Sequence, residues 1–369
     1  MAQATHGLGG LKYDPAKRTR APEWNVLGAL VLIVLVFEIL NRLNGTSFLF
    51  NMRDTGGLLN QQRIDIMILQ VAITGIIAIG VTQVIILGGI DLSSGSVVGA
   101  TAMIVMSFAQ TALVNGNPNP KAIFGDWAMD LPVIVPIVVG LACGLFAGLV
   151  NGLLIAYTRI PPFIATLGMM VSARGVARWW SNGQPVSFPT ESYGQLSNGD
   201  LLGTLTFGLI HWPGQNPAVI FVVLAVLFQV IMIYTLYGKR SYAIGSNEAA
   251  ARMSGINVDR HKVLVYAIAG MLAAVAAILL TSKNLTAQAG MGVMYELDAI
   301  AMAVIGGVSL SGGRGSIIGT VLGAMIFSTI ISGFTSIRLD AYYQEMVKGA
   351  IIVGAVVLDQ WRQRQRTRG

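Results

Sequence analysis

Long apolar segments alternate with short polar segments along most of the chain. Ten apolar segments are candidates for membrane spans: 24–43, 64–87, 97–114, 131–157, 163–180, 217–237, 263–280, 297–308, 317–333 and 343–358. A transmembrane helix needs about 20 apolar residues, and segment 297–308 falls well short of that length. The pattern predicts an all-α, polytopic membrane protein with about ten transmembrane helices.

Composition and charge agree with this pattern. The 369 residues are 54% hydrophobic and 11% charged, whereas soluble domains carry about 25% charged residues. Both ends of the chain are basic, so the positive-inside rule predicts that both termini are cytoplasmic, which requires an even number of crossings. Residues 1–23 are then a polar cytoplasmic tail, residues 24–360 the membrane domain, and residues 361–369 a basic cytoplasmic tail.

A polar stretch at 243–256 interrupts the apolar pattern between two spans. We expect a short helix here, over about 244–256, with Ser246 or Asn247 as its N-cap. Glu248 lies in its first turn, where the helix dipole favours an acid, and Arg252 follows four residues later, at pairing distance on the same face. Gly255 offers a left-handed stop. The alternative is an ordinary loop between two spans.

A glycine- and serine-rich motif occurs twice in the chain. Residues 88–99 read GGIDLSSGSVVG and residues 306–319 read GGVSLSGGRGSIIG. The ordered match predicts an internal repeat, as many transport folds contain, although glycine-rich membrane turns can look alike by chance. In the expected topology both turns lie at the cytoplasmic edge, beside the 244–256 helix. Their polar residues are Asp91, Ser93, Ser311 and Arg314.

Glycines recur every four residues in one segment. They occupy positions 140, 144, 148 and 152 and line one face of the predicted 131–157 helix. Such a face allows two helices to approach closely. The pattern predicts tight packing, either within the chain or between two copies of it.

Several kinds of chemistry are missing from the sequence. It contains no phosphate-binding loop, so any ATP must be hydrolysed by another chain. The histidines at 6, 211 and 261 are scattered and Cys143 is the only cysteine, which makes a metal site improbable. No basic surface is interleaved with aromatic residues, which argues against nucleic acid. The acids Asp91, Glu296 and Asp298 fall at predicted span ends, where anchors and helix caps are commoner than proton relays.

The sequence resembles the permease subunits of bacterial ABC importers for simple sugars, of the ribose, xylose and galactose type. The resemblance covers about residues 55–360. It rests on GGIDLS at 88–93, VNGLL at 150–154, RIPPFIATLG at 159–168, AIGSNEAAARMSGI at 243–256, YELDAI at 295–300 and the turn at 306–316. Glu248, Ala249 and Ala250, with Gly255 after them, match the start of the ABC permease signature Glu-Ala-Ala-x-x-x-Gly, although four residues rather than three separate Ala250 from Gly255. The Ile-x-Leu-Pro ending of many other ABC permeases is missing here, as is usual for this sugar group.

The resemblance implies a multi-pass protein of the bacterial inner membrane with a fold similar to the ten-span vitamin B12 importer permease. It implies three partners besides the lipid bilayer: a cytoplasmic ABC ATPase, a periplasmic sugar-binding protein and a second permease copy in a homodimer. ATP and Mg would be bound by the ATPase, and no cofactor by this chain. The implied ATPase-coupling residues are Gly245, Asn247, Glu248, Ala249, Ala250, Arg252 and Gly255.

We expect a transport subunit rather than an enzyme, which translocates a monosaccharide or related polyol. Gln70, Gln83, Asn151 and Thr166 are candidates for the sugar pathway, because amide and hydroxyl groups suit a neutral, hydroxyl-rich solute. Interhelical hydrogen bonds are an equally good explanation for them. Two alternative functions are an ABC permease for a branched-chain amino acid or a signalling furanose, and a self-sufficient secondary transporter.

Overall fold

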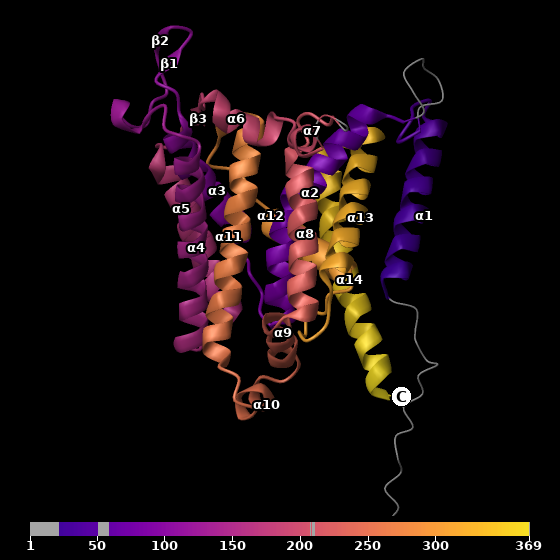
Figure 1. The fold of residues 1–369 in the computed structure, drawn as a ribbon. Helices are drawn as coiled ribbons and strands as arrows, with labels where there is room; N and C mark the ends of the chain where they lie inside the picture. Colours follow the sequence, from indigo (N-terminus) through magenta and orange to yellow (C-terminus); the bar gives the residue numbers. More distant parts are fainter. Residues whose placement is uncertain (1–21, 51–58, 207, 209–210, 369) are drawn as a thin grey trace, which may run out of the picture.

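The computed structural model describes residues 22–50, 59–206, 208 and 211–368. The predicted tail at 1–23 therefore lies outside the described residues, except for its last two. Ten helices form the body of the described chain (Figure 1). They are α1 (Pro22–Leu43), α2 (Gln61–Ile86), α3 (Ser94–Ala109), α4 (Ile134–Tyr157), α5 (Pro162–Trp180), α8 (Asn216–Tyr234), α11 (Val258–Asn284), α12 (Tyr295–Ile305), α13 (Ile317–Ser336) and α14 (Ala341–Arg368).

Each of the ten predicted spans overlaps one of these helices. Six of the described helices are long and apolar enough to cross a membrane, namely α1, α2, α4, α8, α11 and α13. The sixteen-residue α3 is apolar but shorter. The protein is therefore a largely helical, multi-pass membrane protein.

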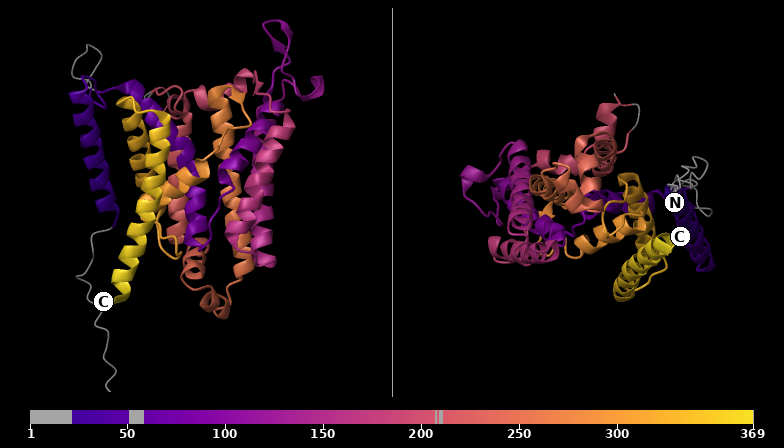
Figure 2. Two further views of the ribbon diagram at one scale, coloured as in Figure 1. Left: turned by 180° about the vertical axis from the view of Figure 1, so that it is seen from behind. Right: turned by 90° about the horizontal axis from the view of Figure 1, so that it is seen from below.

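Short elements cover the two ends of the body. At one end lie α6 (Glu191–Asn198), α7 (Leu201–Leu205), η1 (Asp126–Ala128) and two small antiparallel sheets. Strand β1 (Leu113–Val114) pairs with β2 (Asn117–Pro118), and β3 (Val186–Ser187) pairs with β4 (Thr286–Ala287). The other end carries α9 (Leu236–Ser246) and α10 (Glu248–Met253), and α1 begins and α14 ends on the same side (Figure 1). Helices α4 and α5 form one edge of the body, with α1 and α14 at the opposite edge (Figure 2).

The predicted glycine face packs within the chain. A Cβ added at Gly144 would lie 2.3 Å from the Gly270 carbonyl oxygen, and one at Gly148 would lie 2.3 Å from the Tyr266 carbonyl oxygen. At Gly152 the nearest atom would be the Cα of Val263, at 2.7 Å. Three of the four glycines thus let the backbone of α4 approach the backbone of α11, as small residues do in membrane helix pairs.

Helices α3 and α12 both begin inside the body and run toward opposite ends. The last residue of α3 accepts a hydrogen bond from Thr190 beside the small sheets, whereas α12 ends against α13 at the end that carries α10. Their starts meet, because a Cβ at Gly95 would lie 2.3 Å from the Gly292 carbonyl oxygen. Irregular backbone at this depth is tolerated where protein buries it or where it lines a cavity.

Two predicted elements are organised differently in the structure, namely the helix at 244–256 and the basic tail at 361–369. The expected single helix over 244–256 is two helices, because Asn247 adopts an extended conformation (φ −161°, ψ 102°) between α9 and α10. The last helix, α14, continues to Arg368 and therefore includes most of the basic tail expected at 361–369.

Candidate functional site

Helix α10 is a short helix with well-defined caps at both ends. The side chain of Asn247 accepts a hydrogen bond from the Ala250 amide at 3.0 Å, so Asn247 is the N-cap and Ser246 belongs to α9. At the other end Gly255 takes φ +81°. The Ile256 amide donates to the Ala251 carbonyl and the Gly255 amide donates to the Arg252 carbonyl. This is a Schellman motif, and it confirms the predicted stop.

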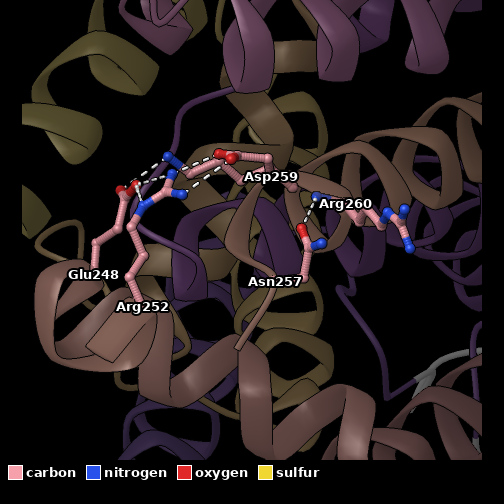
Figure 3. Close-up of polar contacts among 6 residues, drawn as sticks. Glu248, Arg252, Asn257, Asp259 and Arg260 are labelled. Atoms are coloured by element: carbon pink, nitrogen blue, oxygen red, sulfur yellow. Dashed lines mark hydrogen bonds and ion pairs between the residues drawn. The ribbon is translucent and has the colours of Figure 1, made fainter. Parts of the chain in front are cut away.

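Four charged side chains join α10 to the start of α11. We call Glu248, Arg252, Asp259 and Lys262 the α10 charge cluster. Arg252 donates to Glu248 at 3.0 Å and to both carboxylate oxygens of Asp259, one of them at 2.9 Å, and Lys262 donates to the other oxygen of Glu248 at 2.8 Å. Figure 3 shows Arg252 between the two acids, with Arg260 pointing away from them. The predicted pair of Glu248 and Arg252 is thus part of a larger network.

The network favours the charged forms of Glu248, Arg252 and Asp259. Burial alone would raise the pKa of Glu248, but hydrogen bonds from Lys262 and Arg252 outweigh it and leave the pKa below its usual value. The hydrogen bonds from Arg252 to Asp259 and Glu248 raise the pKa of the guanidinium further. Because the Glu248 side chain is 43% exposed and that of Arg252 39%, solvent screens these interactions.

One face of α10 is buried and another is open. Ala251 is buried in a small apolar cluster with Ile244, Val258 and Val265. Ala249 and Ala250 are exposed, and Met253 is 84% exposed. The helix therefore presents two alanines and a methionine outward beside the charge cluster.

Helix α9 packs against the turn of the second repeat. It also packs against the end of α2, the helix that precedes the turn of the first repeat. A Cβ at Gly245 would lie 1.8 Å from the Ile86 carbonyl oxygen, and that oxygen accepts a hydrogen bond from the Gly313 amide at 2.8 Å. A Cβ at Gly312 would lie 3.0 Å from the Cα of Gly88. Glycine is required where three backbones converge in this way. The structure thus brings Gly245 together with both repeat turns.

The polar residues of the two turns lie in different places. Ser311 and Arg314 are exposed at the α10 end. Asp91 and Ser93 are buried at the start of α3, where Asp91 accepts hydrogen bonds from the amide of Ser93 at 2.8 Å and from its hydroxyl at 2.6 Å. The first turn therefore reaches deeper into the body than the second.

The four candidate pathway residues each have a polar contact with another segment, and two of them, Asn151 and Thr166, contact the segment 90–93. Asn151 donates to Ser93 at 2.9 Å and Tyr237 donates to Gln83 at 2.7 Å. The Thr166 hydroxyl lies 3.3 Å from the Ile90 carbonyl oxygen and 2.9 Å from that of Pro162. The Gln70 side chain accepts a long hydrogen bond, at 3.5 Å, from the Ser328 hydroxyl. These contacts favour the structural explanation for this set.

The similarity of this sequence to known proteins identifies its family. Residues 63–356 match the family described as branched-chain amino acid transport system / permease component. The chain belongs to this family. It is also 38% identical to the ribose import permease protein of Bacillus subtilis, over 90% of this chain and 91% of that one. No solved structure matches.

Two further relatives come from Escherichia coli. The galactose/methyl galactoside import permease protein is 34% identical over 77% of this chain and 82% of its own. The xylose transport system permease protein is 33% identical over 92% of this chain and 95% of its own. The chain is therefore a transport permease.

Two ion pairs inside this permease are absent from the sequence-based prediction. Arg174 of α5 donates to Glu296 of α12 at 2.8 Å, and Lys348 of α14 donates to Asp298 of α12 at 3.3 Å. Glu296 and Asp298 are 3% and 5% exposed, respectively. The prediction placed these acids at a span end. An ionisable residue within a membrane segment is a reason to look for function, and that signal could have singled out Glu296 and Asp298.

Proposed function

We propose that the chain is the membrane-spanning subunit of an ATP-driven ABC importer that translocates a monosaccharide or related polyol delivered by a periplasmic binding protein. The observation that carries this proposal is its similarity to ribose, galactose and xylose permeases. Each of these relatives is at least 33% identical over at least 77% of this chain. The chain sits in the bacterial inner membrane with both termini in the cytoplasm.

Helix α10 is the docking element for the ATPase. Its exposed residues Ala249, Ala250 and Met253 offer a small apolar face that fits a cleft, and methionine adapts to irregular surfaces. The adjacent charge cluster fixes the angle of α10 relative to α11. The contact of Gly245 with Ile86 extends this fixed unit to α2. A displacement of α10 is therefore transmitted to two long helices of the body.

Transport follows from a two-state equilibrium. ATP closes the ATPase pair, and the docked α10 helices of two permease copies move with it. Nucleotide drives the change only because it binds the two states with different affinity. The body has ten crossings with a fold similar to that of the vitamin B12 importer permease, and α3 and α12 each supply part of a crossing.

A second candidate is an ABC permease for a branched-chain amino acid, since the matching family carries that description. The two candidates share the same machinery and differ in the solute. A zwitterion favours a site with separate fixed charges, whereas a sugar favours uncharged or charge-balanced hydrogen-bonding groups.

The deciding experiment measures ATP hydrolysis by the reconstituted complex of permease, ATPase and binding protein. The panel contains D-ribose, D-xylose, D-galactose and L-leucine. We expect stimulation by at least one sugar, dependent on the binding protein, and none by leucine. Stimulation by leucine alone would favour the second candidate, and no stimulation by any solute would contradict both.

A further inference from the structure

The starts of α3 and α12 form a polar site inside the body. A Cβ added at Gly95 would lie 2.1 Å from Oε2 of Glu296, so this oxygen points at the first turn of α3. Glu296 itself lies in the first turn of α12. The N-termini of two helices, each with its positive dipole end, therefore face the same carboxylate.

The site also holds buried polar groups with no partner. Oε2 of Glu296 and the hydroxyl of Ser94 make no hydrogen bond within the described chain. Both residues are only 3% exposed. Leaving a buried polar group unpaired costs free energy. A ligand with hydroxyl groups would pair with both.

Arg174 connects this site to the surface of α5. Its Nε donates to Ser96 at 2.9 Å and its Nη2 donates to Glu296 at 2.8 Å, and no described residue accepts a hydrogen bond from Nη1. Its side chain is 32% exposed. The outward face of α5 around it is open, since nothing lies within 4 Å of a Cβ added at Gly168 or Gly175.

Two arginines bring charge to the otherwise largely apolar outward side of α5. Arg174 and Arg178 lie on it beside the exposed Val171, and α5 is not among the described helices that are apolar enough to cross a membrane alone. Charged side chains inside membranes face protein or water-filled cavities. A helix of this kind at the edge of the body (Figure 2) borders an aqueous pathway.

We propose that Arg174 and Glu296 form the contact point for a neutral, polyhydroxylated solute on this pathway. The inference rests on the proposed function. Arg174 supplies donors and Glu296 supplies an acceptor, so neighbouring hydroxyl groups of one sugar bridge them. The two formal charges cancel, which favours a neutral ligand over a carboxylate that Glu296 would repel.

The test uses the assembled complex and a reporter thiol. Val171, one helical turn before Arg174 and 63% exposed, is replaced by cysteine in a Cys143→Ala background. A Val138→Cys variant on α4, 56% exposed, is the matched control. Labelling by a charged maleimide is measured with D-ribose, D-xylose or D-galactose and with the corresponding sugar acids.

We expect the sugar that the wild-type complex imports to slow labelling at position 171 and not at position 138. Glu296→Gln should weaken this protection roughly tenfold and shift it toward the sugar acid, because the guanidinium then lacks its counter-ion. A purely structural ion pair would not produce that reversal. Arg174→Lys, which keeps the charge but not the planar fork, should weaken protection without the shift.

Sugar-independent labelling at position 171, or unchanged protection in Glu296→Gln, would overturn the inference while leaving the proposed function intact. If Glu296→Gln does not assemble, unchanged protection in Arg174→Lys overturns it instead. A wild-type complex that imports none of these sugars would count against the proposed function itself.

Discussion

The α10 charge cluster and the ion pairs of α12 have similar geometry and opposite surroundings. Lys262 lies 2.8 Å from Glu248, and Arg174 lies 2.8 Å from Glu296. The Glu248 side chain is 43% exposed, whereas that of Glu296 is 4% exposed. Exposed pairs contribute little free energy because water and salt screen them. Buried pairs carry a large desolvation cost, so removing one partner is far more damaging than removing both.

Because of this difference in exposure, the two regions have different roles. The exposed cluster has little effect on stability and sets the orientation of a surface helix. The buried pairs hold α12 to α5 and α14 at a cost that a well-packed apolar core would not incur. That cost is the physical reason to expect a function for the interior charges beyond stability.

The largest expected effect follows from leaving an interior charge unpaired. Lys348→Met removes the partner of Asp298, whose side chain is 8% exposed, and should lower the free energy of unfolding by about 3 kcal/mol. Thermal unfolding in detergent measures the change. The matched double variant Lys348→Met/Asp298→Asn should recover most of the loss. Equal destabilisation in the single and double variants would contradict the account of the buried pair.

A charge reversal in the exposed cluster should affect coupling more than stability. Glu248→Lys places a third cation beside Arg252 and Lys262, so α10 loses its fixed angle. The free energy of unfolding should change by about 1 kcal/mol or less, while sugar-stimulated ATP hydrolysis in the complex falls roughly tenfold. Membrane insertion should survive. Wild-type coupling in this variant would count against docking through α10.

Removal of the N-cap should have a smaller and more local effect. Asn247→Ala loses the hydrogen bond to the Ala250 amide and should destabilise α10 by about 1 kcal/mol. Hydrogen exchange at Ala250 and Ala251 should rise, while exchange in the middle of α11 stays unchanged. Asn247→Asp is the control, because aspartate is an equally good cap. Faster exchange throughout α11 would show that α10 does not unfold independently.

The smallest effect is a pH dependence of the exposed cluster. The pKa of Glu248 is lowered from 4.5 on folding, so its contribution to stability is present above that value and is lost as pH falls through the lower folded-state pKa. The difference in melting temperature between wild type and Glu248→Gln should be constant from pH 8 to about pH 5. It should shrink only below pH 4.5. A difference that disappears near neutral pH would contradict the sign of this shift.

The sequence predicted the exposed region well because its determinants are local. Asn247, Glu248, Arg252 and Gly255 lie within nine consecutive residues, and capping and i,i+4 pairing operate over that range. The division into α9 and α10 was missed, because Ser246 and Asn247 are both good caps and only tertiary packing selects one. Gly88 and Gly312 lie together beside α9, whereas Asp91 and Ser93, which the prediction placed at the same edge, are buried inside the body.

The interior region could not be predicted in the same way. Arg174 and Glu296 are 122 residues apart, and no periodicity links them. The sequence showed that segment 297–308 is short. It did not show that α12 begins inside the body, where its start meets the start of α3. The candidate pathway residues were chosen by chemical type, and the structure shows that type alone does not distinguish a packing hydrogen bond from a pathway contact.

The most direct test of the account is solute uptake into proteoliposomes that contain either this chain alone or the complete complex. The complete complex should accumulate at least one of the three sugars with ATP and binding protein present, and an imposed proton or sodium gradient should not replace ATP. The chain alone should accumulate none. Sustained, gradient-driven accumulation by the chain alone would show that the interior charges couple an ion to transport, and would contradict the account.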